Sequence, residues 1–254
     1  MHIKRLVLLA IMFAAPQAAG AQSTWTPYIG PWDYGAGAMA ETNLQNVLIE
    51  QQMESDAGDT QAERGPAAAS NLAAQRAPTA VSARVLRFTP SAQRRRANLA
   101  SFVEKHAATD PAGARALQQQ FAAGDVIGMM GQALAPLGLR VDNLADAYAA
   151  YWITAWNISH GQDSSPTAGQ MQAVKRQTEQ AMAAVPELAG ASDADKQQTA
   201  EAFLVQAAMM QSMFDNATGA AQRQQLAAAV RQGASASGID LDVLQLTENG
   251  FVQR

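Results

Sequence analysis

A succession of helix-start signals after residue 84 constrains the fold more than any other feature of the chain. Capping residues, several of them followed by proline, recur at intervals typical of short helices, and apolar residues follow each one at helical spacing. Alanine is the most frequent residue and aromatic residues make up only 6%, which favours helix over strand. The predicted starts are Thr89-Pro90, Asp110-Pro111, Asp125, Asn143, Ser165-Pro166 and Ser192, with a further helix from about Ala220 to Ser235.

These signals predict a mainly α fold, a compact bundle of about seven helices over residues 85–252. Two short segments are typical of strands. Val85 to Phe88 alternates in polarity, and Leu244 and Leu246 alternate ahead of the turn signal Asn249-Gly250. We expect at most one small two-stranded β element, in which the C-terminal segment could pair with the strand at Val85.

The first 21 residues have the organisation of a cleaved signal peptide. Lys4 and Arg5 precede an uncharged apolar run from Leu6 to Ala15, and Ala19-Gly20-Ala21 supplies the small residues that signal peptidase accepts. The run is shorter than the ~20 residues that a membrane-spanning helix needs, and no later segment reaches that length. We therefore expect cleavage before Gln22 and an exported protein of the periplasm or extracellular space, with no membrane span.

Residues 22–53 form an arm of unusual composition, and residues 54–84 lack periodicity and predict a flexible linker of Ala, Gln, Gly and Ser. Prolines and glycines separate the large rings of the arm, so its first part cannot be helical, whereas a short amphipathic helix is expected from about Glu41 to Met53. The rings are Trp25, Tyr28, Trp32 and Tyr34. Because each can bury about 150–250 Å², we expect the arm to dock on its own domain or on a partner. The alternative is a disordered tail.

Composition excludes several kinds of site. The chain has no cysteine, which rules out disulfides, thiolate metal sites and cysteine nucleophiles. Without the signal peptide only His106 and His160 remain, too few for a three-histidine metal centre. Met209 and Met213 lie four residues apart, a spacing that indicates core packing more than copper ligation. The net charge of −4 argues against general nucleic-acid binding. We expect neither metal nor cofactor.

The helix that begins at Asn143 carries the first candidate site. On a helical wheel its rings occupy one wide face, opposite a narrow strip that includes Asp146, Ala150, Thr154 and Asn157. A helix this apolar is expected in the centre of a bundle. Its rings either supply volume to an alanine-rich core or form the wall of a ligand pocket. They are Tyr148, Tyr151, Trp152 and Trp156.

The second candidate site is a basic segment from Arg84 to Arg115. Arg94, Arg95 and Arg96 lie in the first turns of a predicted helix, where the helix dipole disfavours cations. They form either a solvated face paired with acids elsewhere on the fold, or a patch for an anionic envelope surface, polymer or partner protein.

Short motifs spread over residues 85–252 together resemble a family of exported proteobacterial proteins that is classed only as a domain of unknown function. They are Arg87-Phe88-Thr89-Pro90, Arg95-Arg96-Ala97-Asn98-Leu99, Gly124-Asp125-Val126-Ile127, Gly138-Leu139-Arg140, Asn143-Leu144-Ala145-Asp146-Ala147-Tyr148, Tyr151-Trp152, Ala155-Trp156 and Thr247-Glu248-Asn249-Gly250-Phe251. The resemblance implies export and a mostly helical domain. It brings no reaction, cofactor or catalytic residue.

Two functional hypotheses follow from the residues. The first is a non-enzymatic binding or interaction module of the bacterial envelope. The sequence does not identify its partner; the candidates are an anionic envelope component and a partner protein. The second is a carboxylate-based hydrolase acting on an envelope polymer, because Asp and Glu are the only acid–base groups in good supply. The hydrolase requires two carboxylates that face each other across a cleft about 5–10 Å wide.

Overall fold

The computed structural model describes residues 84–183, 185, 188 and 190–254 of the 254-residue chain. The predicted signal peptide, the aromatic arm and nearly all of the linker lie outside these residues. The rings of Trp25, Tyr28, Trp32 and Tyr34 therefore have no structural description.

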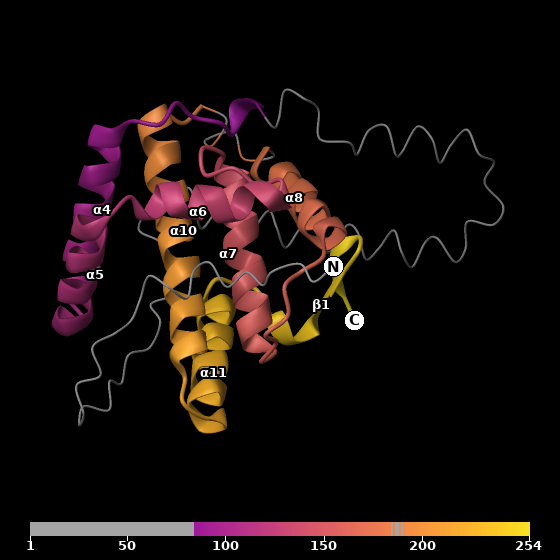
Figure 1. The fold of residues 1–254 in the computed structure, drawn as a ribbon. Coiled ribbons are helices and arrows are strands. Elements are labelled where there is room, and N and C mark those ends of the chain that lie inside the picture. The colour runs from indigo at the N-terminus through magenta and orange to yellow at the C-terminus, as the bar shows by residue number, and fades with distance from the viewer. Residues whose placement is uncertain (1–83, 184, 186–187, 189) are drawn as a thin grey trace, which may run out of the picture.

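The described part of the chain is a helical bundle with one small sheet (Figure 1). Its helices are α4 (Ala92–Ala107), α5 (Pro111–Ala123), α6 (Val126–Leu134), α7 (Leu144–Ser159), α8 (Ala168–Ala183), α10 (Asp193–Asn216) and α11 (Ala220–Ala236). Strands β1 (Leu244–Thr247) and β2 (Gly250–Gln253) form an antiparallel hairpin. The predicted mainly α bundle with one two-stranded β element is confirmed.

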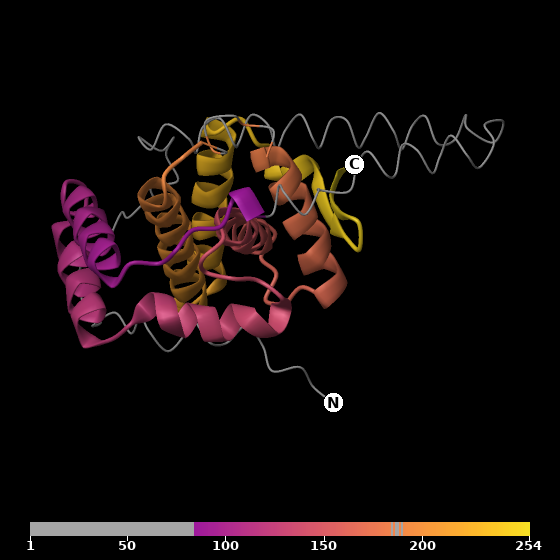
Figure 2. The same ribbon diagram turned by 90° about the horizontal axis from the view of Figure 1, so that it is seen from above.

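Helix α7 runs through the centre of the bundle. In the view from above, the axis of α7 points nearly toward the viewer, and α6, α8, α10 and α11 lie around it (Figure 2). Fourteen of its residues are buried, and it packs against α10, α8 and α11. This position follows from its sequence, because a helix that is apolar on nearly all sides must be enclosed. The α4–α5 pair and the β1–β2 hairpin lie on opposite sides of the bundle (Figures 1 and 2).

The predicted caps of four helices are confirmed. The side chains of Asp110, Asp125 and Asn143 accept backbone N–H groups at the starts of α5, α6 and α7, and Ser192 forms a capping box with Asp195 at α10. Two predicted starts are wrong by a few residues. Ser91, not Thr89, caps α4. The helix predicted from Ser165-Pro166 begins at Ala168, where the Thr167 hydroxyl accepts the Gln170 N–H at 3.0 Å.

The predicted pairing of the Val85 segment with the C-terminal segment is wrong. Arg87 forms an isolated antiparallel bridge with Asn143, in which Phe88 N–H donates to the Asp142 carbonyl at 3.2 Å and Leu144 N–H donates to the Leu86 carbonyl at 3.0 Å. The C-terminal segment instead pairs with itself through the Asn249-Gly250 turn, where Gly250 has a φ of 98°. Residues 86–88 are therefore hydrogen-bonded to the residues at the start of α7 and hold that start in place.

Candidate functional site

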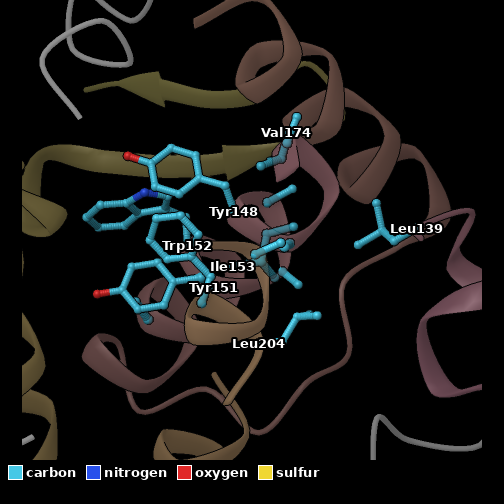
Figure 3. Close-up of a cluster of buried hydrophobic side chains, with 14 of the residues drawn as sticks. Leu139, Tyr148, Tyr151, Trp152, Ile153, Val174 and Leu204 are labelled. Carbon is cyan, nitrogen blue, oxygen red and sulfur yellow. The ribbon is translucent and has the colours of Figure 1, made fainter. Parts of the chain in front are cut away.

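The aromatic face of α7 lies in the core. Tyr148 and Tyr151 are fully buried, and their rings lie 4.9 and 5.4 Å from the ring of Phe203 on α10. Trp152 meets both tyrosines edge to face, at 5.9 and 5.2 Å between ring centroids. The three rings gather at one side of the buried cluster, and Leu139 and Val174 lie at the other (Figure 3). Such edge-to-face packing is the arrangement that aromatic rings prefer in protein interiors.

Trp156 connects α7 to the C-terminal hairpin. Its indole N–H donates to the Leu244 carbonyl at 3.0 Å, its ring stacks on His160 at 4.4 Å, and it lies 6.3 Å from the ring of Phe251. None of the four predicted site rings of α7 lines the cavity that the structure shows beside this helix. Their observed role is packing between α7, α10 and the hairpin.

A cavity of about 320 Å³ opens instead along the opposite, narrow strip of α7. From this strip Ala150, Thr154 and Asn157 line it. The buried lining comprises Met130, Leu134, Ile153, Met171, Leu204 and Ala207, from α6, α7, α8 and α10. The remaining lining is polar and comes from the loop after α7 and from α10 and α11: Gln162, Asp163, Ser164, Ser165, Gln211, Asp215 and Arg223. An apolar interior with a polar opening is typical of a small-molecule site, and this volume is at the low end of the usual range.

The loop after α7 presents Asp163 at this opening. Gly161 turns the chain with a φ of 63°, and Gln162 N–H donates to the Asn157 carbonyl at 2.8 Å. The Asn157 side-chain amide lies 3.5 Å from the Ser164 carbonyl on the other side of Asp163. The acid is thus held between two anchored residues and is itself exposed.

Asp215 is half-buried in the last turn of α10, where the helix dipole disfavours a carboxylate. Gln211 donates to its Oδ1 at 2.9 Å. Burial raises the pKa of Asp215 above its usual range and the Gln211 hydrogen bond opposes that shift; the charge of Asp163 raises the pKa and that of Arg223 lowers it. The charges of Asp163 and Arg223 therefore both act on Asp215.

Arg223 lies in the first turns of α11, and its guanidinium covers the Phe214 ring at 4.9 Å from the centroid. Among the residues that the structure describes, no acid lies within ion-pair distance of Arg223, and no base lies within that distance of Asp163. The opening thus carries two carboxylates and one guanidinium. The exposed charges of Asp163 and Arg223 form no ion pair within the described part of the chain.

The three predicted basic residues of α4 separate in the structure. Arg94 donates from Nε to the Gln197 side-chain oxygen at 3.0 Å and from Nη2 to the Thr89 carbonyl at 2.7 Å. Arg95 pairs with Glu201 at 3.0 Å, a carboxylate with 2% exposure on α10, and with Asp125 at 3.0 Å. Arg96 is exposed. Arg94 and Arg95 therefore hold α4 against α10, which explains cations in the first turns of a helix.

A second group of acids, Asp146 and Glu179, lies around Lys175 of α8 and connects parts of the fold. Asp146 is fully buried in α7, accepts the Arg140 N–H at 2.8 Å and pairs with Lys175 at 3.0 Å. Burial raises the pKa of Asp146 and of Glu179, and the ammonium of Lys175 opposes both shifts. The carboxylate of Asp146 therefore joins the loop before α7 to α8.

Within the described residues, no three His, Cys, Asp or Glu side chains are grouped in a way that could hold a metal ion. No helix there combines the length and the apolar character that crossing a membrane requires.

Sequence reasoning did not identify Asp163, Gln211, Asp215 or Arg223 as site residues. One signal was available for Asp215, an acid placed against the dipole at the end of a predicted helix and four residues after Gln211. The strip of Ala150, Thr154 and Asn157 is apparent on the helical wheel, and it lines the cavity that the predicted aromatic face does not.

Comparison with known proteins identifies the family but not an activity. Neither the curated proteins nor the solved structures yield a match. The model of the family described as "Family of unknown function (DUF6683)" matches residues 1–254. The match spans the whole sequence, and the chain is a member of this family of unknown function.

Proposed function

We propose that the chain is a non-enzymatic binding module of the bacterial envelope, and that its ligand is a small molecule held in the cavity between α6, α7 and α10. The observation that carries the proposal is the cavity itself, about 320 Å³ with a buried apolar interior and a polar opening. Fixed helices form its interior, and a loop anchored to Asn157 forms part of its opening. The arrangement suits a ligand with an apolar body and a polar end.

A matched pair of threonine substitutions tests this proposal. Thr154 and Thr199 are both helical, and their hydroxyls donate to the carbonyl four residues earlier, at 2.8 and 3.0 Å. Only Thr154 lines the cavity. A library of small amphiphiles is screened by methyl NMR, with Met130 and Met171 as reporters. Thr154→Leu fills part of the cavity and should abolish the binding that Thr199→Leu retains. Equal binding by both variants, or no hit at the two reporters, contradicts the proposal.

Export is part of this proposal. The basic start and apolar run of residues 1–21 support cleavage before Gln22 and a function in the periplasm or outside the cell. An anionic envelope component remains the proposed macromolecular partner, and Arg96 is its best candidate contact because Arg94 and Arg95 have partners within the fold. Mass spectrometry of the protein from a periplasmic fraction should give a chain that begins at Gln22. A retained Met1 would contradict export by this route.

The carboxylate-based hydrolase is the second candidate, and one observation favours it. Asp163 and Asp215 line the same cavity, and the raised pKa of Asp215 suits a general acid that works with a second carboxylate. On this hypothesis isolated cell-wall polymer releases soluble fragments with the protein, and both Asp215→Asn and Asp163→Asn abolish the release. Release that persists in both variants contradicts it.

A further inference from the structure

The opening of the cavity combines charges of both signs around an apolar interior. Asp163 and Asp215 supply two carboxylates, and Arg223 supplies a guanidinium. We propose that the cavity binds an apolar α-amino acid, whose ammonium lies between Asp163 and Asp215, whose carboxylate meets Arg223, and whose side chain enters the apolar interior. This inference rests on the proposed function, and it names the chemical class of the ligand.

The size of the cavity limits the ligand to a small molecule. At about 30 Å³ for each water in the liquid, 320 Å³ corresponds to roughly ten waters, or a ligand of about a dozen heavy atoms. The interior offers no charged group, because its buried lining consists of alanine, leucine, isoleucine and methionine. Met130 and Met171 are suited to an aromatic or branched side chain, since methionine adapts its shape and its sulfur makes favourable contacts with rings.

The acidic side of the opening suits an ammonium group. Gln211 occupies Oδ1 of Asp215, and no described residue is paired with Asp163. The charges of Asp163 and Asp215 repel each other, and a cation between them would remove that repulsion. An ammonium offers three donors, which match two carboxylates and one nearby amide or hydroxyl oxygen.

The basic side suits a carboxylate. The guanidinium of Arg223 is a planar fork that binds a carboxylate through two parallel hydrogen bonds. Its stacking on the Phe214 ring orients that fork without using its donors. The charge of Arg223 also lowers the pKa of Asp215, so the positive and negative charges at this opening interact with each other.

Four compounds that share a phenyl ring separate the contributions of the ammonium and the carboxylate to binding. L-phenylalanine carries both charges, 2-phenylethylamine only the ammonium, 3-phenylpropionate only the carboxylate, and 2-phenylethanol neither. Each is titrated into the full chain, with the methyl groups of Met130 and Met171 as reporters and the buried Met182, which does not line the cavity, as control. L-phenylalanine should bind most tightly, with each lost charge weakening binding about tenfold at this partly exposed opening.

Two surface substitutions then assign the charges. Arg223→Gln should weaken L-phenylalanine and 3-phenylpropionate about tenfold and leave 2-phenylethylamine unchanged. Asp163→Asn should weaken L-phenylalanine and 2-phenylethylamine and leave 3-phenylpropionate unchanged. Both residues are exposed, so the fold should persist, and this reciprocal pattern cannot result from general loss of structure.

The outcomes distinguish this inference from the proposed function. If all four compounds shift the two reporters with equal affinity, the cavity binds small molecules but the inference of an amino acid ligand is wrong. If L-phenylalanine binds most tightly yet neither variant changes its affinity, the assignment to Asp163 and Arg223 is wrong. If none of the four shifts the reporters, the inference fails whatever the broader library binds.

Discussion

Arg95→Ala should destabilise the fold far more than the same change at Arg96. Arg95 is 22% exposed and donates to Glu201, which is 2% exposed, at 3.0 Å. Removing one partner of a fully buried pair costs about 3–5 kcal/mol. Asn98 and Gln197 still donate to Glu201, at 2.7 and 2.9 Å, and Arg95 is partly solvated, which reduces this loss to about 2 kcal/mol.

The contact of Arg95 with Asp125 adds less. Asp125 is 60% exposed, and such surface pairs contribute at most about 1 kcal/mol. The total loss is therefore about 2–3 kcal/mol, which lowers the Tm by roughly 4–12 °C for a domain of this size. Arg96 is exposed, so Arg96→Ala should change stability by less than about 0.5 kcal/mol.

Urea unfolding followed by the fluorescence of the buried Trp152 and Trp156 measures both variants. Adding Glu201→Gln to Arg95→Ala should cost less than the sum of the single changes, because no uncompensated carboxylate is then left buried. Equal stability of Arg95→Ala and Arg96→Ala would refute the structural role assigned to Arg95 and would return it to the candidate anionic-binding surface.

Three further predictions concern titration, the hairpin and the arm. Burial lowers the pKa of His106 in the folded state. The unfolded chain therefore binds more protons than the folded chain as the pH falls through the ordinary value of about 6.5, and the fold loses stability on acidification. His106→Gln should remove part of this loss, as measured by calorimetry between pH 7 and 5. Trp156→Phe removes the hydrogen bond to the Leu244 carbonyl and should cost about 1–3 kcal/mol; Trp152→Phe should cost less, because the Trp152 indole N–H has no acceptor within the described part of the chain. If the arm docks, a chain that starts at Val85 should melt below the full-length protein or lose one of its captured partners; an unchanged Tm, tryptophan emission and partner set would contradict docking.

The helices were predictable because their signals are local. Asp110, Asp125 and Asn143 cap the turn that immediately follows them, and the apolar composition of α7 alone places it in the centre. The bridge between Arg87 and Asn143 was not predictable, because it depends on how the segment before α7 lies against residues more than 50 positions earlier in the chain. The Ser91 cap was missed because Thr89-Pro90 offers an equally good local start signal.

The candidate cavity depends on packing rather than on local pattern. Asp163 and Asp215 come from a loop and a helix end that are distant in sequence, and only the arrangement of α7, α10 and α11 brings them to one opening. The rings of α7 were ambiguous in sequence, because aromatic side chains supply both cores and pocket walls. Contacts with Phe203 place Tyr148 and Tyr151 in the core, where Trp152 and Trp156 are also buried.

The most direct test of the central claim, that the cavity along Ala150, Thr154 and Asn157 is the binding site, is an NMR measurement of NOEs from the tightest-binding compound of the amphiphile library. This compound tests the cavity independently of the amino acid inference. We expect NOEs from its apolar part to the methyl groups of Met130, Ile153 and Leu204, and none to Met182. NOEs to residues outside the cavity, or none at saturating concentration, would contradict the account.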